Sequence, residues 1–426
     1  MQVYRRLLGD NPEFTKLWLA QVISLTGDWF NTVVLSALVA QFTSGSGLAV
    51  SIFLMARFLP PLLVSPFAGV LVDRFNRKQL LIWSNLLRAL IVPLFLLATE
   101  PEHLWIIYAV TIAQFTLSAI FEPGQSAIIP ALVRPQQLVE ANTLVSVTWS
   151  VMLALGAVLG GAFAFAFGTE AALVADAVTF AVAAALIAWI AYDPALGRKL
   201  QKAVQPDVPA EEEDTSFWEG IRYVLRTPQM AAALFVKFGQ SIGNVDTLMT
   251  IFATQVFVLG SNGELSLGLM FSAFGVGAFI GPMLTNRIND GSVRRMRRLI
   301  ALGFAAIVVG WFLWGFTSVF WLACLAILVR GLGGSINWTY SVIIIQKTAP
   351  DAKLGRMFAL DMAGFQLATI VSTLIHGWLI DQVALDDLHW IVLGTGVVAV
   401  VPLLIWLWIV QSLEQREEPA AAVTGD

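Results

Sequence analysis

The sequence predicts an all-α membrane protein of about twelve transmembrane helices, arranged as two pseudo-symmetric six-helix bundles. Three observations predict this class. Hydrophobic residues make up 58% of the 426 residues and charged residues only 13%, whereas soluble domains carry roughly 25% charged residues. Long apolar segments recur along the whole chain, and the longest polar interruption lies near its middle. Among the connections between these segments, Lys and Arg occur only in every second one.

Each predicted span is an apolar run of about 20 residues or more, the length that a helix needs to cross a bilayer. The first half contains spans at residues 14–42, 48–72, 79–98, 104–129, 141–167 and 171–191. The second half contains spans at residues 229–259, 265–288, 298–316, 320–346, 354–380 and 388–410. The first span is too long for the apolar region of a cleavable signal peptide, so we expect the protein to retain it.

Basic residues set the expected orientation, because Lys and Arg concentrate in cytoplasmic connections. The connections that hold them alternate with connections that hold none, such as TSGSG at residues 43–47 and TEPEH at residues 99–103. The two ends of the chain lie on the basic side. We therefore expect a multi-pass protein of a bacterial cytoplasmic membrane, with both termini cytoplasmic.

The polar interruption separates two expected domains. They are an N-terminal six-helix bundle at residues 1–192 and a C-terminal six-helix bundle at residues 228–412, followed by a cytoplasmic tail at residues 413–426. The linker between the bundles, residues 193–227, is strongly charged. Its end, from about Ser216 to Arg226, carries apolar residues on one side and predicts an amphipathic helix.

Short similarities between the halves indicate an internal repeat, as in transporters built from parallel repeats. GVLVDR from Gly69 aligns with GPMLTNR from Gly281, and Gly27–Asp28 in the first span corresponds to Gly243–Asn244 in the seventh. The charges inside the spans do not repeat. We therefore expect the two halves to share the same helix arrangement and to carry different functional residues.

The expected cytoplasmic turn between the second and third spans is GVLVDRFNRK, residues 69–78. Its glycine, Asp-Arg pair and two further cations resemble the signature of the major facilitator superfamily. FEPGQSAIIPALVRPQQLVEAN at residues 121–142 and ARFLPPLLVSPFAG at residues 56–69 resemble its macrolide-efflux and enterobactin-exporter-like branch. The resemblance implies a secondary transporter of the drug/proton antiporter type that works by alternating access.

In that family this turn forms a cytoplasmic gate between the two halves. Carried over to this chain, the resemblance implies that Asp73 faces the positive N-terminal end of the eleventh span, at residues 355–358. It also implies that Arg77 pairs with Glu122. With Asp361, which lies near the cytoplasmic end of its span, the expected gate comprises Gly69, Asp73, Arg74, Arg77, Lys78, Glu122 and Asp361. In the other interpretation, the basic residues of the turn only fix the orientation of the chain.

Several positions depart from the pattern of the family. Asn76 stands where the family usually has Gly, and we expect Asn to tolerate a positive φ there. The mirror segment of the second half has Thr285 and Asn286 in place of Asp-Arg, so we expect a one-sided gate. Ala157 stands where drug/proton antiporters commonly have Pro. We therefore expect the glycine-rich stretch at residues 155–161 to serve close helix packing.

Ionisable residues inside the spans predict a polar cavity, because each costs about 3 kcal/mol in a bilayer without a partner. Asp28 in the first span is the leading candidate for proton coupling, and Asp246 in the seventh span is the second. A permanent ion pair between Asp28 and an arginine is the structural alternative. We expect Lys237 to extend its ammonium toward the cytoplasm and Asp176, near the outer end of its span, to be interfacial.

Aromatic rings beside buried cations suit an amphipathic substrate. The expected cavity comprises Trp29, Asn31, Arg57, Arg88, Trp149, Lys237, Arg330, Trp338 and Tyr340. The predicted function is proton-coupled export of an amphipathic drug, siderophore or lipid-like molecule. A proton-independent uniporter and a lysophospholipid flippase are alternatives. A non-transporting membrane sensor and a membrane-embedded lipid-modifying enzyme are alternatives from other classes.

The sequence favours neither an enzyme nor a metal site. Cys324 is the only cysteine, and the three histidines are widely separated. No HEXXH metal motif or phosphate-binding P-loop occurs. We expect no cofactor, no metal and no nucleic-acid partner. The expected partners are a small-molecule substrate, protons and the lipid bilayer, and we expect the protein to be a monomer.

Overall fold

The computed structural model describes residues 2–192, 217–243, 245–260, 262–350 and 353–423. All regular secondary structure within these residues is helical. Eleven helices are long and apolar enough to cross a membrane. The predicted all-α architecture is therefore confirmed, although one of the twelve predicted spans is not a continuous helix.

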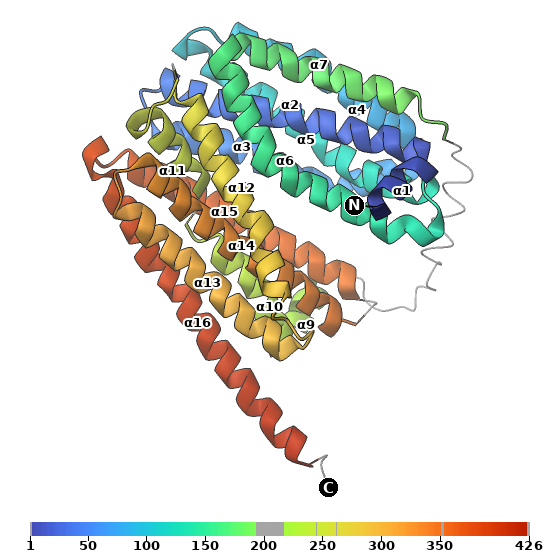
Figure 1. Cartoon of the computed structure of the whole chain (residues 1–426), viewed down its shortest axis with the longest axis vertical. Helices are drawn as coiled ribbons and strands as arrows, with labels where there is room; N and C mark the ends of the chain where they lie inside the picture. The colour runs from blue at the N-terminus through green and yellow to red at the C-terminus, as the bar shows by residue number, and fades with distance from the viewer. Residues whose placement is uncertain (1, 193–216, 244, 261, 351–352, 424–426) are drawn as a thin grey trace. The chain divides into compact units, whose positions relative to one another are not determined.

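Each of the first six predicted spans corresponds to one long helix (Figure 1). The helices of the first half are α1 (Gln2–Asp10), α2 (Pro12–Phe42), α3 (Gly47–Arg74), α4 (Arg77–Ile91), α5 (Leu104–Ile128), α6 (Leu138–Phe167) and α7 (Thr169–Ala188). The third span continues beyond α4 as a 3₁₀ segment, Val92–Leu97. Pro93 lies in the first turn of this segment and cannot donate an α-helical hydrogen bond, so the helix tightens there.

The second half contains the predicted linker helix and five continuous spans. Its helices are α9 (Phe217–Arg226), α10 (Pro228–Gln240), α11 (Val245–Ile251), α12 (Glu264–Asn286), α13 (Val293–Gly315), α14 (Phe320–Thr348), α15 (Leu354–Ile380) and α16 (Leu388–Val423). The rest of the predicted linker, residues 193–216, lies outside the described residues.

The prediction of a continuous seventh span, residues 229–259, is wrong. The helix ends at Gln240, resumes as the short helix α11, and finishes in a π-helical segment, Phe252–Val256. Gly243 lies at the interruption with φ +90°. Side chains satisfy its backbone: the N–H of Gly243 donates to Ser372 Oγ at 2.9 Å, and its carbonyl accepts from Arg330 Nη2 at 2.9 Å. Such partners allow irregular backbone within a membrane-spanning region.

The chain forms two compact units. The first comprises Met1–Glu211 and Thr250–Ser272, and the second comprises Glu212–Met249 and Ala273–Asp426. In the first unit, α2 packs against α6 and α7, α3 packs against α5, and α4 packs against α5 and α7. In the second unit, α13 packs against α14 and α16, and α10 packs against α14, α15 and α16.

Glycines in α6 allow close helix contacts, as the sequence predicts. A Cβ atom on Gly160 would lie 2.9 Å from the Cα of Phe30 in α2. A Cβ atom on Gly161 would lie 2.5 Å from the carbonyl oxygen of Glu264, at the start of α12. The glycine-rich stretch therefore serves backbone packing within the first unit.

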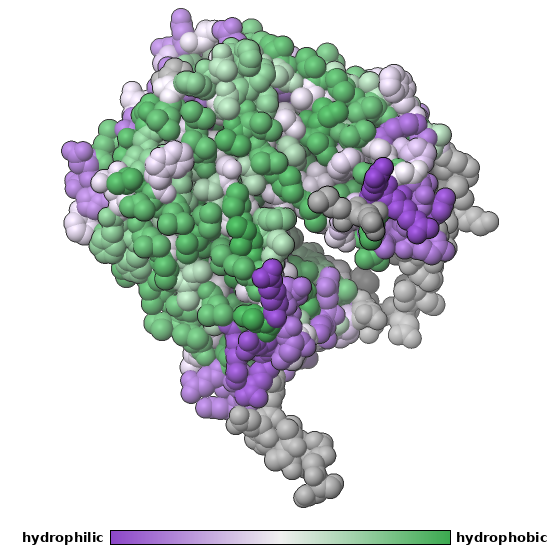
Figure 2. Space-filling view, in the orientation of Figure 1, coloured by the Kyte–Doolittle hydropathy of each residue, from purple (hydrophilic) through white to green (hydrophobic). Residues whose placement is uncertain are grey.

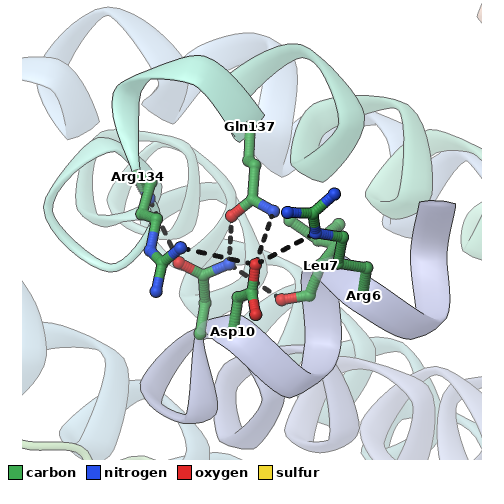
Figure 3. A network of polar contacts seen from close by, with 6 residues as sticks. Arg6, Leu7, Asp10, Arg134 and Gln137 are labelled. Carbon is green, nitrogen blue, oxygen red and sulfur yellow. Dashed lines mark hydrogen bonds and ion pairs between the residues drawn. The ribbon is translucent and has the colours of Figure 1, made fainter.

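A polar network fixes α1, a helix that the sequence analysis did not predict, to the connection before α6 (Figure 3). Asn11 Nδ2 donates to the carbonyl of Leu7 and to Gln137 Oε1, both at 2.8 Å. The backbone N–H of Arg134 donates to Asn11 Oδ1 at 3.1 Å. Asp10 accepts from Gln137 Nε2 at 3.3 Å. Because Leu7 is fully buried in the adjoining apolar core, α1 belongs to the packed part of the first unit.

Apolar side chains cover most of the molecular face drawn in Figure 2, and hydrophilic residues gather in separate clusters. The exposed large apolar residues include Trp83, Leu90, Trp189, Phe316 and Trp408. Soluble proteins rarely expose so much contiguous apolar surface. Together with the eleven long apolar helices, this surface identifies a multi-pass membrane protein.

Candidate functional site

A buried polar network crosses three helices of the first unit. Asp28 and Asn31 lie one turn apart on α2, Gln114 lies on α5, and Asp176 lies on α7. Gln114 Nε2 donates to Asp28 Oδ1 at 3.2 Å. Asn31 Nδ2 donates to Gln114 Oε1 at 3.2 Å and to Asp176 Oδ2 at 2.8 Å. Two side-chain amides thus connect two carboxylates.

Asp176 contradicts its expected interfacial position. Its side chain is fully buried, because α7 packs closely against α2 beside Gly27. Asp176 Oδ1 has no hydrogen-bond partner among the described residues. A buried carboxylate oxygen without a donor is costly, so Asp176 is a chemically unusual residue in this core.

Arg88 on α4 supplies a buried cation near this network. Its guanidinium donates to Asn85 Oδ1 at 2.9 Å, to Ser118 Oγ at 3.2 Å and to the carbonyl of Ser84 at 3.4 Å. It also lies 4.5 Å from the ring centre of Phe180. These contacts hold Arg88 independently of the two carboxylates.

Two of the expected arginines, Arg57 and Arg88, influence Asp28 electrostatically. The Arg57 guanidinium lies 4.9 Å from the ring centre of Phe115. Among the described residues, no ion pair joins Asp28 to Arg88. The direct partner of the Asp28 carboxylate is the Gln114 amide.

A second charged cluster lies in the second unit. Lys237 Nζ on α10 lies 2.5 Å from Asp361 Oδ2 on α15, and both side chains are fully buried. The ammonium also lies 4.0 Å from the ring centre of Trp338, whose edge packs against Phe365. The expectation that Lys237 extends toward the cytoplasm is therefore wrong, because a buried carboxylate on the neighbouring helix holds the ammonium inside.

Arg330 on α14 holds the interruption between α10 and α11. Besides its hydrogen bond to Gly243, its guanidinium lies 5.1 Å from the ring centre of Trp311. Arg330 also interacts electrostatically with Asp246, the second candidate for proton coupling. This arginine therefore supports the local fold at the broken span.

The other expected cavity residues lie in different environments. Trp29 on α2 is half-buried and packs edge-on against Phe271, with ring centres 5.5 Å apart. Tyr340 is buried and its hydroxyl donates to Thr285 Oγ1 at 3.1 Å. Trp149 is 55% exposed on α6. Of these three residues, Trp29 is the one that adjoins Asp28 in the sequence.

The expected gate residues are only partly described. The surroundings of Gly69 and of the Asp73 side chain are not described. Arg77 is buried at the start of α4, and its Nη1 donates to the carbonyl of Ala127 at the end of α5 at 3.0 Å. Arg74 is exposed, Lys78 is half-buried, and Glu122 is exposed on α5.

Asn76 does not need a positive φ. It adopts φ −68° and caps α4, where its Oδ1 accepts from the backbone N–H of Gln79 at 3.4 Å. Asn is among the preferred N-cap residues because its side chain satisfies a free N–H group of the first turn. The departure from glycine at this position therefore has a local structural role.

These expected residues divide between the two units. Asp28, Asn31, Arg57 and Arg88 belong to the first unit, and Lys237, Arg330, Trp338 and Asp361 belong to the second. The sequence analysis missed Gln114 and misplaced Asp176. A usable signal was present, because a carboxylate within an apolar span indicates a functional site. No metal-binding group of three or more His, Cys, Asp or Glu side chains occurs among the described residues.

Comparison with known proteins identifies the family. The family model described as "Major Facilitator Superfamily" matches residues 17–324 and 262–424. The chain therefore belongs to the major facilitator superfamily, a family of membrane transporters.

Curated relatives extend over most of the chain. "Uncharacterized MFS-type transporter YfiS" of Bacillus subtilis (strain 168) is 26% identical over 365 residues, covering 83% of this chain and 84% of the relative. "Putative bacilysin exporter BacE" of Bacillus amyloliquefaciens is 23% identical over 366 residues, covering 85% and 88%. "Macrolide efflux protein A" of Streptococcus pyogenes is 23% identical over 403 residues, covering 91% and 94%. The expected resemblance to macrolide-efflux proteins is confirmed.

Solved structures show the same fold. The nucleoside transporter NupG has a TM-score of 0.70 at 12% identity, covering 93% of this chain and 98% of that chain. A bacterial homologue of the iron transporter ferroportin has a TM-score of 0.67 at 16% identity, covering 94% and 98%. At such low identity, the likeness concerns the fold alone.

Proposed function

We propose that this transporter is a proton-coupled exporter of an amphipathic small molecule and works by alternating access. The observation that carries the proposal is the Asp28 carboxylate within the long apolar helix α2, held by the Gln114 amide. A carboxylate at such a depth is costly unless its charge is matched or it takes up a proton. Protonation and release at Asp28 would couple the proton gradient to the transport cycle.

The proposed substrate class rests on the relatives and on the aromatic residue beside Asp28. Two relatives are named for export of bacilysin and efflux of macrolides. Trp29 follows Asp28 directly and is half-buried. An amphipathic ligand could place its apolar part against this indole ring while its polar part lies near Asp28.

The proposal includes the orientation and the gate. Both termini are cytoplasmic, in accordance with the distribution of Lys and Arg between the connections. The proposed cytoplasmic gate comprises Gly69, Asp73, Arg74, Arg77, Lys78, Glu122 and Asp361, and the proposed six-helix bundles are residues 1–192 and 228–412. The protein works as a monomer in a bacterial cytoplasmic membrane, without a cofactor.

Labelled ligand uptake into proteoliposomes under an imposed pH gradient tests this function. The probes are a macrolide, bacilysin, a catecholate siderophore and lysophosphatidylcholine. The proteins are wild type, Asp28→Asn and the control Asp386→Asn, whose side chain is exposed in a connection of the second unit. We expect at least one probe to accumulate in wild type and in the control only while the gradient is present.

Asp28→Asn should lower gradient-driven accumulation at least about tenfold, which corresponds to about 1.4 kcal/mol. Equal ligand uptake with and without the pH gradient would show that the protein is a proton-independent uniporter instead. If lysophosphatidylcholine is the only probe that crosses, and it does so without the pH gradient, the protein is a lysophospholipid flippase instead. Specific ligand binding without flux would identify a membrane sensor.

A further inference from the structure

Asp28 and Asp176 form the two ends of one hydrogen-bonded chain. The Gln114 amide donates to Asp28 and accepts from Asn31, and the Asn31 amide donates to Asp176. Because both ends are carboxylates, each amide must direct its N–H groups toward an acceptor. The orientation of the two amides is thereby fixed, and the two carboxylates are linked through only two side chains.

Two arginines lie close enough to this hydrogen-bonded chain to act on it electrostatically. Arg88 on α4 uses its donors on Asn85, Ser118 and the carbonyl of Ser84. Among the residues that the structure describes, neither carboxylate forms an ion pair with Arg88. Arg57 on α3 acts on Asp28 electrostatically.

The remaining charged groups near the chain are few. Glu122 on α5 interacts electrostatically with Asp28 and Arg88. The only charged residue of α6 is Glu140, in the first turn of that helix. Residues 92–97, which pack against α7, carry no charge. Arg88 influences both carboxylates electrostatically, and Asp176 is also influenced by the charge of Asp28.

The two ends of the chain differ in access. Asp28 is half-buried and Asp176 is fully buried. Asp176 Oδ1 has no donor in the described part of the chain. It faces the α2 backbone at Gly27, where even a Cβ atom would lie only 2.5 Å away. Position 27 therefore cannot supply a side-chain donor to this oxygen.

Two carboxylates in one buried network repel each other when both are ionised, and such pairs titrate as one coupled system. We propose that Asp28 and Asp176 share one proton, and that Asp176 is the second residue of the proton-coupling site. The proton comes from water, bonds to one carboxylate oxygen and leaves the other carboxylate ionised. Asp28 is the exchange point with water, because it is the more exposed of the two carboxylates, and Asp176 tunes its affinity for the proton.

Infrared spectroscopy of the reconstituted full chain tests the shared proton without a substrate. The measurement follows the carbonyl stretch of protonated carboxyl groups as the pH is varied. Wild type, Asp28→Asn, Asp176→Asn, the double variant and the exposed control Asp386→Asn are compared. Melting curves establish which variants fold.

We expect wild type and Asp386→Asn to show a titrating carboxyl band with the amplitude of one proton. Each single substitution should abolish the whole band, and the double variant should match either single variant. Two separate bands, each lost in one single variant and summing to the loss in the double variant, would overturn the proposal. So would a band that none of these substitutions changes.

If Asp176→Asn does not fold, the carboxyl band of Asp28→Asn by itself tests whether the proton is shared. This variant should lose the band although Asp176 is intact, whereas an independent Asp176 would keep its own contribution. The role in coupling rests on the proposed function, but the sharing of the proton does not. A protein that shows the shared band and yet transports without proton flux would contradict the proposed function and leave the shared proton established.

Discussion

Lys237 and Asp361 show what a buried charge requires in this fold. Their side chains come from α10 and α15, are fully buried and lie 2.5 Å apart. Removing one partner of such a pair leaves an uncompensated charge, whereas replacing both with apolar residues is often tolerated. Asp361 Oδ1 already lacks a partner among the described residues, so this site is sensitive to the loss of the ammonium.

Lys237→Met should therefore lower the stability of the second unit by about 3 to 5 kcal/mol. The double variant Lys237→Met/Asp361→Leu should recover most of this loss. Melting temperatures in detergent measure both effects, with the exposed control Asp386→Asn expected to melt as wild type does. A double variant that melts below Lys237→Met would show that the ion pair does not act as a unit.

At the scale of helices, glycine allows backbones to approach each other in the first unit. A Cβ atom on Gly161 would meet the carbonyl oxygen of Glu264 at 2.5 Å, and one on Gly268 would meet the carbonyl of Ala157 at 2.5 Å. The helices α6 and α12 are thus in backbone contact at this point. Small residues serve the same purpose in many membrane proteins.

Gly161→Ala should separate these two helices and destabilise the protein by about 1 to 3 kcal/mol. Gly364→Ala in α15 is the matched control, because nothing lies within 4 Å of the added Cβ there. This control should be neutral or stabilise the helix by up to about 1 kcal/mol. Equal melting temperatures of the two variants would argue against close packing at Gly161.

The interruption between α10 and α11 depends on a single glycine. Gly243→Ala should cost about 1 to 2 kcal/mol, because φ of +90° is unfavourable for residues with a Cβ atom. The added atom would also lie 2.6 Å from Thr395 Cγ2. Gly334→Ala, in open surroundings within α14, is the control. If the Gly243→Ala melting temperature equals that of the control, the positive φ is not required.

Hydropathy predicts most of the helices but not this interruption. Most of the helices found long enough to span end within a few residues of the predicted bounds, and Leu354–Ile380 coincides with its predicted span. The last helix extends further at its C-terminal end. The seventh predicted span is apolar over most of its length, yet it breaks at Gly243. The bonds that permit the break come from Arg330 and Ser372, far away in the sequence. A local pattern cannot contain that information.

The sequence likewise predicts only part of the candidate site: it indicates single residues but not their partners. Asp28 is evident from the sequence because it is a carboxylate inside an apolar run. Its connection to Asp176 requires α2, α5 and α7 to meet, with Gln114 and Asn31 between the carboxylates. Lys237 likewise depends on a partner 124 residues away. Sequence position suggests depth in the membrane, but only packing decides which charges meet.

At the scale of the whole molecule, the proposed cycle requires a gate that opens and closes. Arg77 is buried at the end of the turn formed by residues 69–78 and donates to the carbonyl of Ala127. The family resemblance implies that it also pairs with Glu122. An ion pair of this kind would contribute to the closed state of the cytoplasmic gate.

Arg77→Ala and Glu122→Ala should therefore be non-additive, with a coupling energy of about 0.5 to 3 kcal/mol. The measurement is a double-mutant cycle on the melting temperature and on the transport rate. Glu140→Ala, at the start of α6, combined with Arg77→Ala supplies an uncoupled control pair. Simple additivity of Arg77→Ala and Glu122→Ala would favour the interpretation in which the basic turn only fixes orientation.

The central claim is that substrate movement and proton movement are one process at Asp28. Its most direct test records the lumenal pH of proteoliposomes with a dye while a macrolide or bacilysin is added, for wild type and Asp28→Asn. The account predicts ligand-triggered proton flux in wild type and its disappearance in Asp28→Asn, with ligand binding retained. Ligand flux without proton flux in wild type, or proton flux in Asp28→Asn equal to that of wild type, would contradict it.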